Sequence, residues 1–408
     1  MNVVYKTIWN AALGAWVAVC ETARARGKRS GGRRALSGAS LVAPLLGVPL
    51  FLLSGTASAV CTLAGNVLTC TGTTPGWVGV SNGGTINNSG EIAKLGDGTW
   101  GIYTGANITV NNTGTISGTS GVVLGGNAVI NNNGGIIRST DRAIQVTGGP
   151  VTLTNSNGGI IEGLAGALIY GGGTIVNTGN SRITSTGNYL GLGFGGGSAS
   201  ITNTLGSTIS GAAASIYGQA TSLTLDNGGL LQGSAIFDGG LVQRVTLRVG
   251  SRIVGDLSIG SKTGSTLTLA GAGTQIYSQA ATGTTTFGGD LFKEDSGDWV
   301  INRSMAPRTA TVNAGALGFA SGGTFGAGTA LSLAAAGTLL HTDSGNAAVG
   351  NLSGVAGSKI ALAAGSSLRM ADGTSTTIAS DFSGGGALIK SGSGTLTLSG
   401  NNSGFTGS

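Results

Sequence analysis

Charged residues, histidine and cysteine are all scarce in this sequence. Only 9% of the 408 residues are charged, and the chain holds one histidine and three cysteines. One histidine and one close pair of cysteines cannot supply the ligands of a zinc centre. Gly373-Thr374-Ser375 faintly resembles the nucleophile string of a serine protease, which needs a histidine base. The lone histidine, His341, precedes Ser375 by too few residues for the chain order Asp, His, Ser on an α/β scaffold. We therefore expect no catalytic residue, no metal site and no cofactor, and we expect His341 to be a solvated turn residue.

Glycine, by contrast, is abundant, with 80 residues of 408, and in such a chain literal motif matches arise by chance. Gly191-Leu192-Gly193-Phe194-Gly195-Gly196 satisfies the G-x-G-x-x-G string of dinucleotide-binding proteins. No helix-forming stretch follows it, and no acidic residue lies about 20 positions further on, so we expect no nucleotide site. Disorder is disfavoured because Val, Ile and Leu recur at alternate positions, as in Val151-Thr152-Leu153-Thr154.

The net charge of +6 is confined to the N-terminal part of the chain. Residues 1–59 hold seven of the 21 basic residues and one of the 15 acidic residues, which leaves 14 of each sign in residues 60–408. A nucleic-acid-binding surface needs a basic stripe, and residues 60–408 have none. We therefore assign the basicity to targeting and expect no nucleic-acid partner.

Residues 1–59 have the organisation of a secretory signal peptide. The basic stretch from Arg24 to Arg34 precedes the apolar run Leu41–Leu53, and the small residues Ala57 and Ala59 follow. This order predicts signal peptidase cleavage after Ala59, which makes Val60 the first residue of the mature chain. The apolar run is shorter than the roughly 20 residues of a membrane span, so we do not expect a retained anchor.

From about residue 82 the sequence repeats an apolar residue, an Asn-rich turn, a glycine and a second apolar residue, as in Ile86-Asn87-Asn88-Ser89-Gly90-Glu91-Ile92. The asparagine markers follow one another at steps of 24, 20, 23, 22, 26 and 24 residues: Asn88, Asn112, Asn132, Asn155, Asn177, Asn203 and Asn227. Each interval also contains a second apolar pair beside glycine, such as Gly101-Ile102-Tyr103, so one rung supplies about three strands.

This pattern predicts an all-β chain that forms a right-handed parallel β-helix of some fifteen rungs, preceded by a helical signal segment. Inward apolar side chains would stack between rungs, and the repeated asparagines would form a hydrogen-bonded ladder at one corner. Leucine-rich and propeller repeats have comparable periods, but their L-x-x-L-x-L and Trp-Asp signatures are absent. Four tyrosines are expected to be exposed: Tyr103, Tyr170, Tyr189 and Tyr217.

Two cysteines remain after the predicted cleavage. Cys61 and Cys70 bracket a short segment in which Gly65-Asn66 can turn a hairpin, and an oxidising compartment would join the two thiols. The alternative, acylation of Cys61 in a lipoprotein, needs a small residue just before the cysteine, and Val60 stands there instead.

Both ends of the sequence resemble known families. The first residues resemble the extended signal-peptide region of very large exported proteins of Gram-negative bacteria, through Tyr5, Trp9, Asn10, Gly14, Trp16 and Val17. Residues 386–402 resemble the autotransporter-associated β-strand repeat, through Leu388, Lys390, Gly392, Gly394, Leu396 and Leu398. A block 97 positions earlier, at 289–301, aligns with this repeat.

The resemblance implies an autotransporter passenger that is exported through the Sec machinery and displayed on the outer membrane or released. It also implies a C-terminal outer-membrane barrel, which this sequence does not contain, so we expect a truncated precursor. The expected organisation is a signal peptide at 1–59, a disulfide hairpin or cap at 60–81, Asn/Gly-rich rungs at 82–260, and a β-helix with strand repeats at 261–408.

The favoured function is adhesion or autoaggregation, with host surface molecules, matrix or like fibres as partners. The alternative is the stalk of an autotransporter whose hydrolase domain lies beyond this sequence.

Overall fold

The computed structural model describes residues 5–10, 15–20, 61–93, 99–237, 242–320, 322–371 and 373–408. The chain divides into two compact units, Met1–Gly55 and Thr56–Ser408. In the first unit, β1 (Tyr5–Asn10) and β2 (Ala15–Cys20) pair antiparallel. The prediction of a helical signal segment is therefore wrong over these two stretches. Both stretches contain several aromatic and β-branched residues, which favour strands, and this explains the difference.

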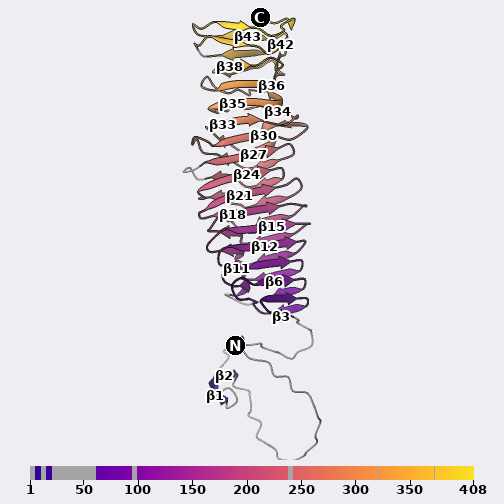
Figure 1. Cartoon of the computed structure of the whole chain (residues 1–408), viewed down its shortest axis with the longest axis vertical. Coiled ribbons are helices and arrows are strands. Elements are labelled where there is room, and N and C mark those ends of the chain that lie inside the picture. The colour runs from indigo at the N-terminus through magenta and orange to yellow at the C-terminus, as the bar shows by residue number, and fades with distance from the viewer. Residues whose placement is uncertain are drawn as a thin grey trace, which may run out of the picture. The chain divides into compact units, whose positions relative to one another are not determined.

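The second unit is a β-solenoid of about 15 turns, as the sequence predicted. Figure 1 shows its strands stacked in successive layers from β3 (Cys61–Ala64) to β43 (Ala387–Lys390). In its first two thirds, each turn contributes one strand to each of three parallel sheets, here called sheets 1, 2 and 3. None of the helices among the described residues has the length and apolarity needed to cross a membrane.

In sequence order, sheet 1 begins with β3, β4 (Val67–Cys70), β6 (Thr85–Asn88), β9 (Thr109–Asn112), β12 (Ala128–Asn133), β15 (Val151–Ser156), β18 (Gly173–Asn177), β21 (Ser198–Asn203), β24 (Ser222–Asn227), β27 (Gln243–Arg248), β30 (Thr266–Ala270) and β33 (Asp290–Lys293). Sheet 2 contains β5 (Thr73–Pro75), β7 (Glu91–Ala93), β10 (Thr115–Gly118), β13 (Ile136–Ser139), β16 (Ile160–Gly163), β19 (Arg182–Ser185), β22 (Thr208–Ser210), β25 (Leu230–Gln232) and β28 (Arg252–Val254). Sheet 3 contains β8 (Trp100–Tyr103), β11 (Ser120–Leu124), β14 (Arg142–Val146), β17 (Ala165–Ile169), β20 (Leu190–Phe194), β23 (Ala214–Gly218), β26 (Ala235–Phe237), β29 (Leu257–Ser258) and β32 (Thr285–Thr286).

Each strand places alternate side chains inside the coil. In β15, Val151, Leu153 and Asn155 are buried, whereas Thr152 and Thr154 face outward. Inward residues of successive strands lie in register, so that Leu153 follows Ile130 and precedes Ile175. The three inner faces thus form one continuous apolar core along the unit, which hydrophobic burial stabilises.

The last third keeps the coil but changes its corners. A one-turn helix, α1 (Tyr277–Ala280), follows β31 (Thr274–Ile276). The strands β33 and β34 (Asp298–Ile301) both pair with the long strand β35 (Thr309–Phe319). Gly315 lies within β35 at φ +66° and allows the corner to form without breaking the strand.

The remaining strands continue the stack. They are β36 (Ala330–His341), β37 (Asn346–Val349), β38 (Asn351–Gly354), β39 (Lys359–Leu362), β40 (Ser367–Met370), β41 (Thr376–Ile378), β42 (Asp381–Gly384), β43, β44 (Leu396–Leu398) and β45 (Gly404–Phe405).

Candidate interaction surface

The exposed aromatic residues lie on or beside the strands of sheet 3. Trp77, Trp100, Tyr103, Tyr170 and Tyr189 are 54%, 38%, 47%, 48% and 53% exposed. Two of them belong to β8, two lie next to an end of β17 or β20, and Trp77 precedes a residue that bridges to β8. No other aromatic side chain in the part of the chain that the structure describes is as exposed as these five.

Three of the rings, called the β8 cluster below, lie at the start of sheet 3, and two of them contact each other. The ring centroids of Trp100 and Tyr103 are 4.5 Å apart, with their planes inclined at 33°. A Cβ added to Gly79, one turn earlier, would lie 2.6 Å from the Tyr103 carbonyl oxygen and 3.4 Å from the Trp77 ring. The absence of a side chain at Gly79 therefore lets Trp77 lie close to β8.

A second group surrounds β20. A Cβ on Gly193 would lie 2.7 Å from Leu168 Cδ2 and 3.0 Å from Leu190 Cδ1, and one on Gly195 would lie 2.8 Å from Tyr170 Cδ1. The apolar side chains thus fold over a strand that has no outward side chains of its own at these positions. This packing accounts for the G-x-G-x-x-G string, which forms a strand rather than a phosphate-binding turn before a helix.

The exposed positions of three tyrosines confirm the expectation from the sequence, whereas Tyr217 in β23 is only half-exposed. Trp77 and Trp100 were missed. The signal for Trp100 was available in Trp100-Gly101-Ile102-Tyr103, where the buried Gly101-Ile102 pair separates two outward rings.

Sheet 3 is almost free of charge. Arg142 is the only charged residue in its nine strands. Arg142 Nη1 donates a hydrogen bond to Gln145 Oε1 at 2.9 Å, and its Nε lies 4.0 Å from the Asp141 carboxylate. The sheet therefore attracts neither polyanions nor polycations at long range.

The predicted asparagine ladder is present at the inner edge of sheet 1. All seven marker asparagines are buried, and the Nδ2 of each of the first six donates to the Oδ1 of the next marker at 2.7–2.9 Å. Each Nδ2 before the last also donates to a carbonyl of its own turn and to one of the next turn, as Asn155 does to Gly159 and Arg182. The ladder therefore ties each turn to the next by side-chain bonds, and it adds a second donor to corner carbonyls such as that of Gly159, which also accepts the Arg182 backbone N–H.

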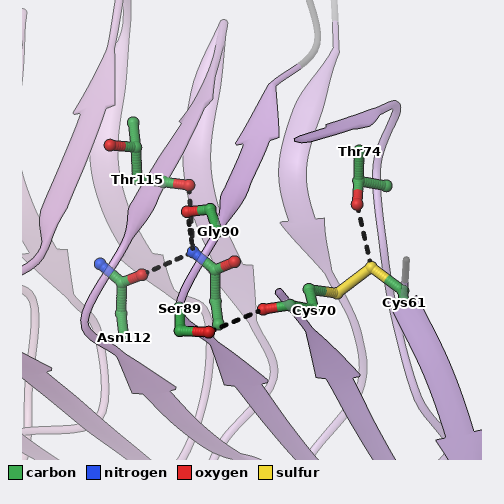
Figure 2. Close-up of a disulfide and its surroundings, with 8 residues drawn as sticks. Cys61, Cys70, Thr74, Ser89, Gly90, Asn112 and Thr115 are labelled. Atoms are coloured by element: carbon green, nitrogen blue, oxygen red, sulfur yellow. Dashed lines mark hydrogen bonds between the residues drawn. A yellow bond between two sulfur atoms is a disulfide. The ribbon is translucent and has the colours of Figure 1, made fainter. Parts of the chain in front are cut away.

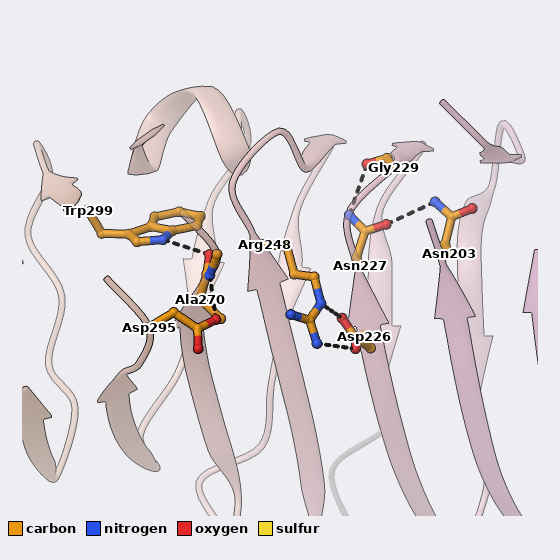
Figure 3. A network of polar contacts seen from close by, with 9 residues as sticks. Asn203, Asp226, Asn227, Gly229, Arg248, Ala270, Asp295 and Trp299 are labelled. Atoms are coloured by element: carbon orange, nitrogen blue, oxygen red, sulfur yellow. Dashed lines mark hydrogen bonds and ion pairs between the residues drawn. The ribbon is translucent and has the colours of Figure 1, made fainter. Parts of the chain in front are cut away.

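The ladder ends at Asn227, and Figure 3 shows its last members beside the contacts of the later turns. Asn227 Nδ2 donates to Gly229, and Leu247 occupies the next position in register. On the outer side, the Arg248 guanidinium binds the Asp226 carboxylate through two hydrogen bonds of 2.7 Å. In the later turns, Trp299 Nε1 of β34 donates to the carbonyl oxygen of Ala270, the last residue of β30, at 3.1 Å.

The register column of the asparagines continues from Asn227 through Leu247 and Leu269 to Lys293, three strands after the last asparagine. Lys293 there takes over the role of the asparagines. Its side chain is fully buried. Its Nζ donates to the carbonyl oxygens of Glu294, of Asp295 at 2.8 Å, and of Ala314 in the next turn at 3.0 Å. Burial lowers the pKa of the Lys293 amine from its ordinary value, and nearby acidic side chains partly oppose this effect.

The strand-repeat residues are brought together in part. Leu388 and Lys390 lie in β43, whereas Leu396 and Leu398 lie in β44, and these strands belong to two different small sheets. Gly392 and Gly394 lie between them, with Gly392 at φ +92°. Lys390 Nζ donates to the Ser391 carbonyl at 3.0 Å, much as Lys293 bonds the turn after its own strand.

Cys61 and Cys70 are joined by a disulfide across the hairpin of β3 and β4. Gly65, at φ +60°, lies at the turn. Figure 2 shows the bond and its surroundings, with Cys61 Sγ 3.0 Å from Thr74 Oγ1. Cys70 aligns with Asn88 on β6, so the hairpin forms a layer of sheet 1 directly before the ladder.

His341 is not the solvated turn residue that the sequence predicted. It ends β36, its side chain is 2% exposed, and it packs edge-on against Phe319, with ring centroids 6.3 Å apart. Neither ring nitrogen has a hydrogen-bond partner, although Nδ1 lies 3.4 Å from the Asp343 carboxylate. The prediction failed because β36 is long enough to carry the residue to an inward position.

The predicted cleavage residues Ala57, Ala59 and Val60 lie outside the described residues. The fold defines the class of the protein as a β-solenoid. Residues 1–50 match the family model described as the extended signal peptide of the type V secretion system, and no solved structure matches the chain. The match covers 50 of the 408 residues, and these residues carry a signal for Sec-dependent export and for surface or extracellular display.

Proposed function

We propose that this solenoid is the passenger of an autotransporter and acts in adhesion or self-association at the cell surface. The observation that carries the proposal is a set of five exposed aromatic side chains on or beside the strands of one almost uncharged sheet. Exposed aromatic groups concentrated on one face are a feature of interaction sites. Repetition along the solenoid multiplies weak contacts, and multivalency adds them. The partners are host surface or matrix molecules, or like fibres on neighbouring cells.

We also infer that the role is structural rather than catalytic. The only histidine of the sequence is buried against Phe319, where a substrate in solvent cannot reach its ring nitrogens. A serine nucleophile in this chain would therefore lack an accessible imidazole base.

The test compares cells that carry the complete gene with a deletion strain and with a strain in which residues 61–408 are removed in frame. We expect cells with the complete gene to settle faster in suspension, or to bind host cells or matrix-coated plates more strongly, than either comparison strain. Equal settling and equal binding in all three strains would contradict the proposal.

A further inference from the structure

The arrangement of the rings on sheet 3 limits what can bind there. Tyr103 and Tyr217 lie in one register column, separated by Val123, Gln145, Leu168 and Gly193. Five strand steps of about 4.8 Å place the two tyrosines about 24 Å apart along the sheet. Tyr103 and Tyr217 therefore mark the two ends of a track that runs from strand to strand. Tyr170, two residues after Leu168, borders this track, whereas Tyr189 lies toward the opposite end of the strands.

The track does not suit a second protein copy, so self-association of like fibres would use another face of the solenoid. A stable protein interface buries about 800 Å² per partner around a continuous apolar core. Between the β8 cluster and the β20 group, Val123 is only 8% exposed and the next outward residue is the polar Gln145. The apolar groups are thus two separate islands, with no continuous core between them.

Charge excludes another class of ligand. With Arg142 as the only charged strand residue, and with that residue near Asp141, the face offers no complement to an anionic polymer or a charged peptide. Hydrogen-bonding groups near the rings are neutral, because Gln145 contributes an amide and Gln219 donates to the Tyr217 hydroxyl at 3.4 Å. Neutral ligands with both apolar and hydroxyl-rich surfaces fit this set.

We propose that the outer face of sheet 3 binds a neutral, linear saccharide chain that lies along the solenoid axis. The C–H face of a pyranose ring stacks on an aromatic side chain, while its hydroxyl groups bond to amides beside the track. A pyranose ring is about as long as one strand spacing, so a chain of sugars can contact both islands together. The inference rests on the adhesive function proposed above and names the ligand class of that surface.

The test uses cells that display the product of the complete gene and beads coated with cellohexaose, chitohexaose or N-acetyllactosamine repeats, with heparin beads as the anionic comparison. One variant combines W100A with Y103A, and a second combines Y170A with Y217A, the two tyrosines at the later end of the track. The control is L205A, because Leu205 is 71% exposed and lies in the turn between β21 and β22, outside sheet 3. The variant W100F/Y103F keeps the stacking faces. Surface display is measured by antibody staining for every strain.

We expect wild-type cells to bind at least one neutral saccharide more strongly than heparin. Each double alanine variant should lose about tenfold in affinity, equivalent to about 1.4 kcal/mol. The L205A and W100F/Y103F variants should bind like the wild type. Failure of wild-type cells to bind any neutral saccharide, or equal losses in the L205A control, would overturn the inference.

The two proposals fail separately. If periodate oxidation of host-cell sugars leaves adhesion unchanged while deletion of the gene abolishes it, adhesion stands and the saccharide platform is refuted. If deletion leaves adhesion and settling unchanged, the adhesive function is refuted. Binding of the purified protein to the saccharide beads then tests the saccharide inference independently of adhesion.

Discussion

Replacing Asn155 by alanine should destabilise the solenoid more than replacing Asn88, although both residues belong to the same ladder. Asn155 lies in the middle, where its Oδ1 accepts from Asn132 and its Nδ2 donates to Asn177 and to two carbonyls. Asn88 is the first member, and its Oδ1 is already buried without a partner. The two substitutions therefore leave different numbers of unsatisfied groups.

The difference can be worked out bond by bond. Asn155→Ala removes four hydrogen bonds and leaves Asn177 Oδ1 without its donor, whereas Asn132 Nδ2 keeps two carbonyl acceptors. Asn88→Ala removes three bonds and leaves Asn112 Oδ1 without a donor, but it also eliminates the unsatisfied oxygen of Asn88 itself. Asn155→Ala thus loses one more hydrogen bond than Asn88→Ala and leaves one more unsatisfied acceptor. Its loss of stability should therefore be larger by about 2–4 kcal/mol.

Hydrogen exchange followed by mass spectrometry is the suitable assay, because repeat proteins open locally and a single unfolding transition is not assured. The free energy of opening should fall in the peptides that cover β15 to β19 for Asn155→Ala, and should fall less around β6 and β9 for Asn88→Ala. Asn227→Ala, at the other end of the ladder, is the matched control and should resemble Asn88→Ala. Equal effects of all three substitutions would refute the reasoning.

Three further predictions concern single groups. Reduction of the Cys61–Cys70 bond should lower the stability by about 2–3 kcal/mol, because the unfolded chain regains the entropy of the open loop. The resulting faster amide hydrogen exchange should be confined to β3, β4 and β6. Faster exchange beyond β12 would show that the bond stabilises more than the first turns. Burial raises the pKa of Tyr277 to about 12 from 10.0, so the folded form retains a proton that the unfolded form loses above pH 10. The free energy of unfolding should therefore fall by up to about 3 kcal/mol between pH 10 and 12. The Tyr277→Phe variant, which has no phenol at this site, should lack this part of the fall when its stability is measured over the same pH range. His341→Leu should leave stability unchanged or raise it by about 1–3 kcal/mol at neutral pH, because it removes two buried nitrogens without partners; a clear decrease in the urea midpoint would show that the imidazole contributes to folding.

The turn period and the ladder could be predicted from the sequence because both depend on local, repeated signals. Asn112, Asn132 and Asn155 recur beside glycine, and the structure aligns these markers in register as expected. The pairing of Cys61 with Cys70 was also readable, since Gly65-Asn66 permits a tight turn between them.

Features that depend on alignment between distant turns could not be predicted. Lys293 lies in the column of the asparagines because of the insertions between β24 and β33, and nothing in its local sequence reports that position. The burial of His341 depends in the same way on the length of β36. The sequence identified exposed tyrosines one at a time, but their presence on a single sheet follows from the variable lengths of the intervening turns.

The donor direction in the asparagine ladder gives the stack two chemically unlike ends. Every Nδ2 points toward the later turn, so the early side presents a carboxamide oxygen and the late side an amide hydrogen that already has a carbonyl acceptor. A turn that joins on the early side meets a fixed acceptor for its own amide, whereas one that joins on the late side meets a donor that is already occupied. The ladder therefore favours the addition of turns toward the amino terminus over the addition of turns toward the carboxyl terminus.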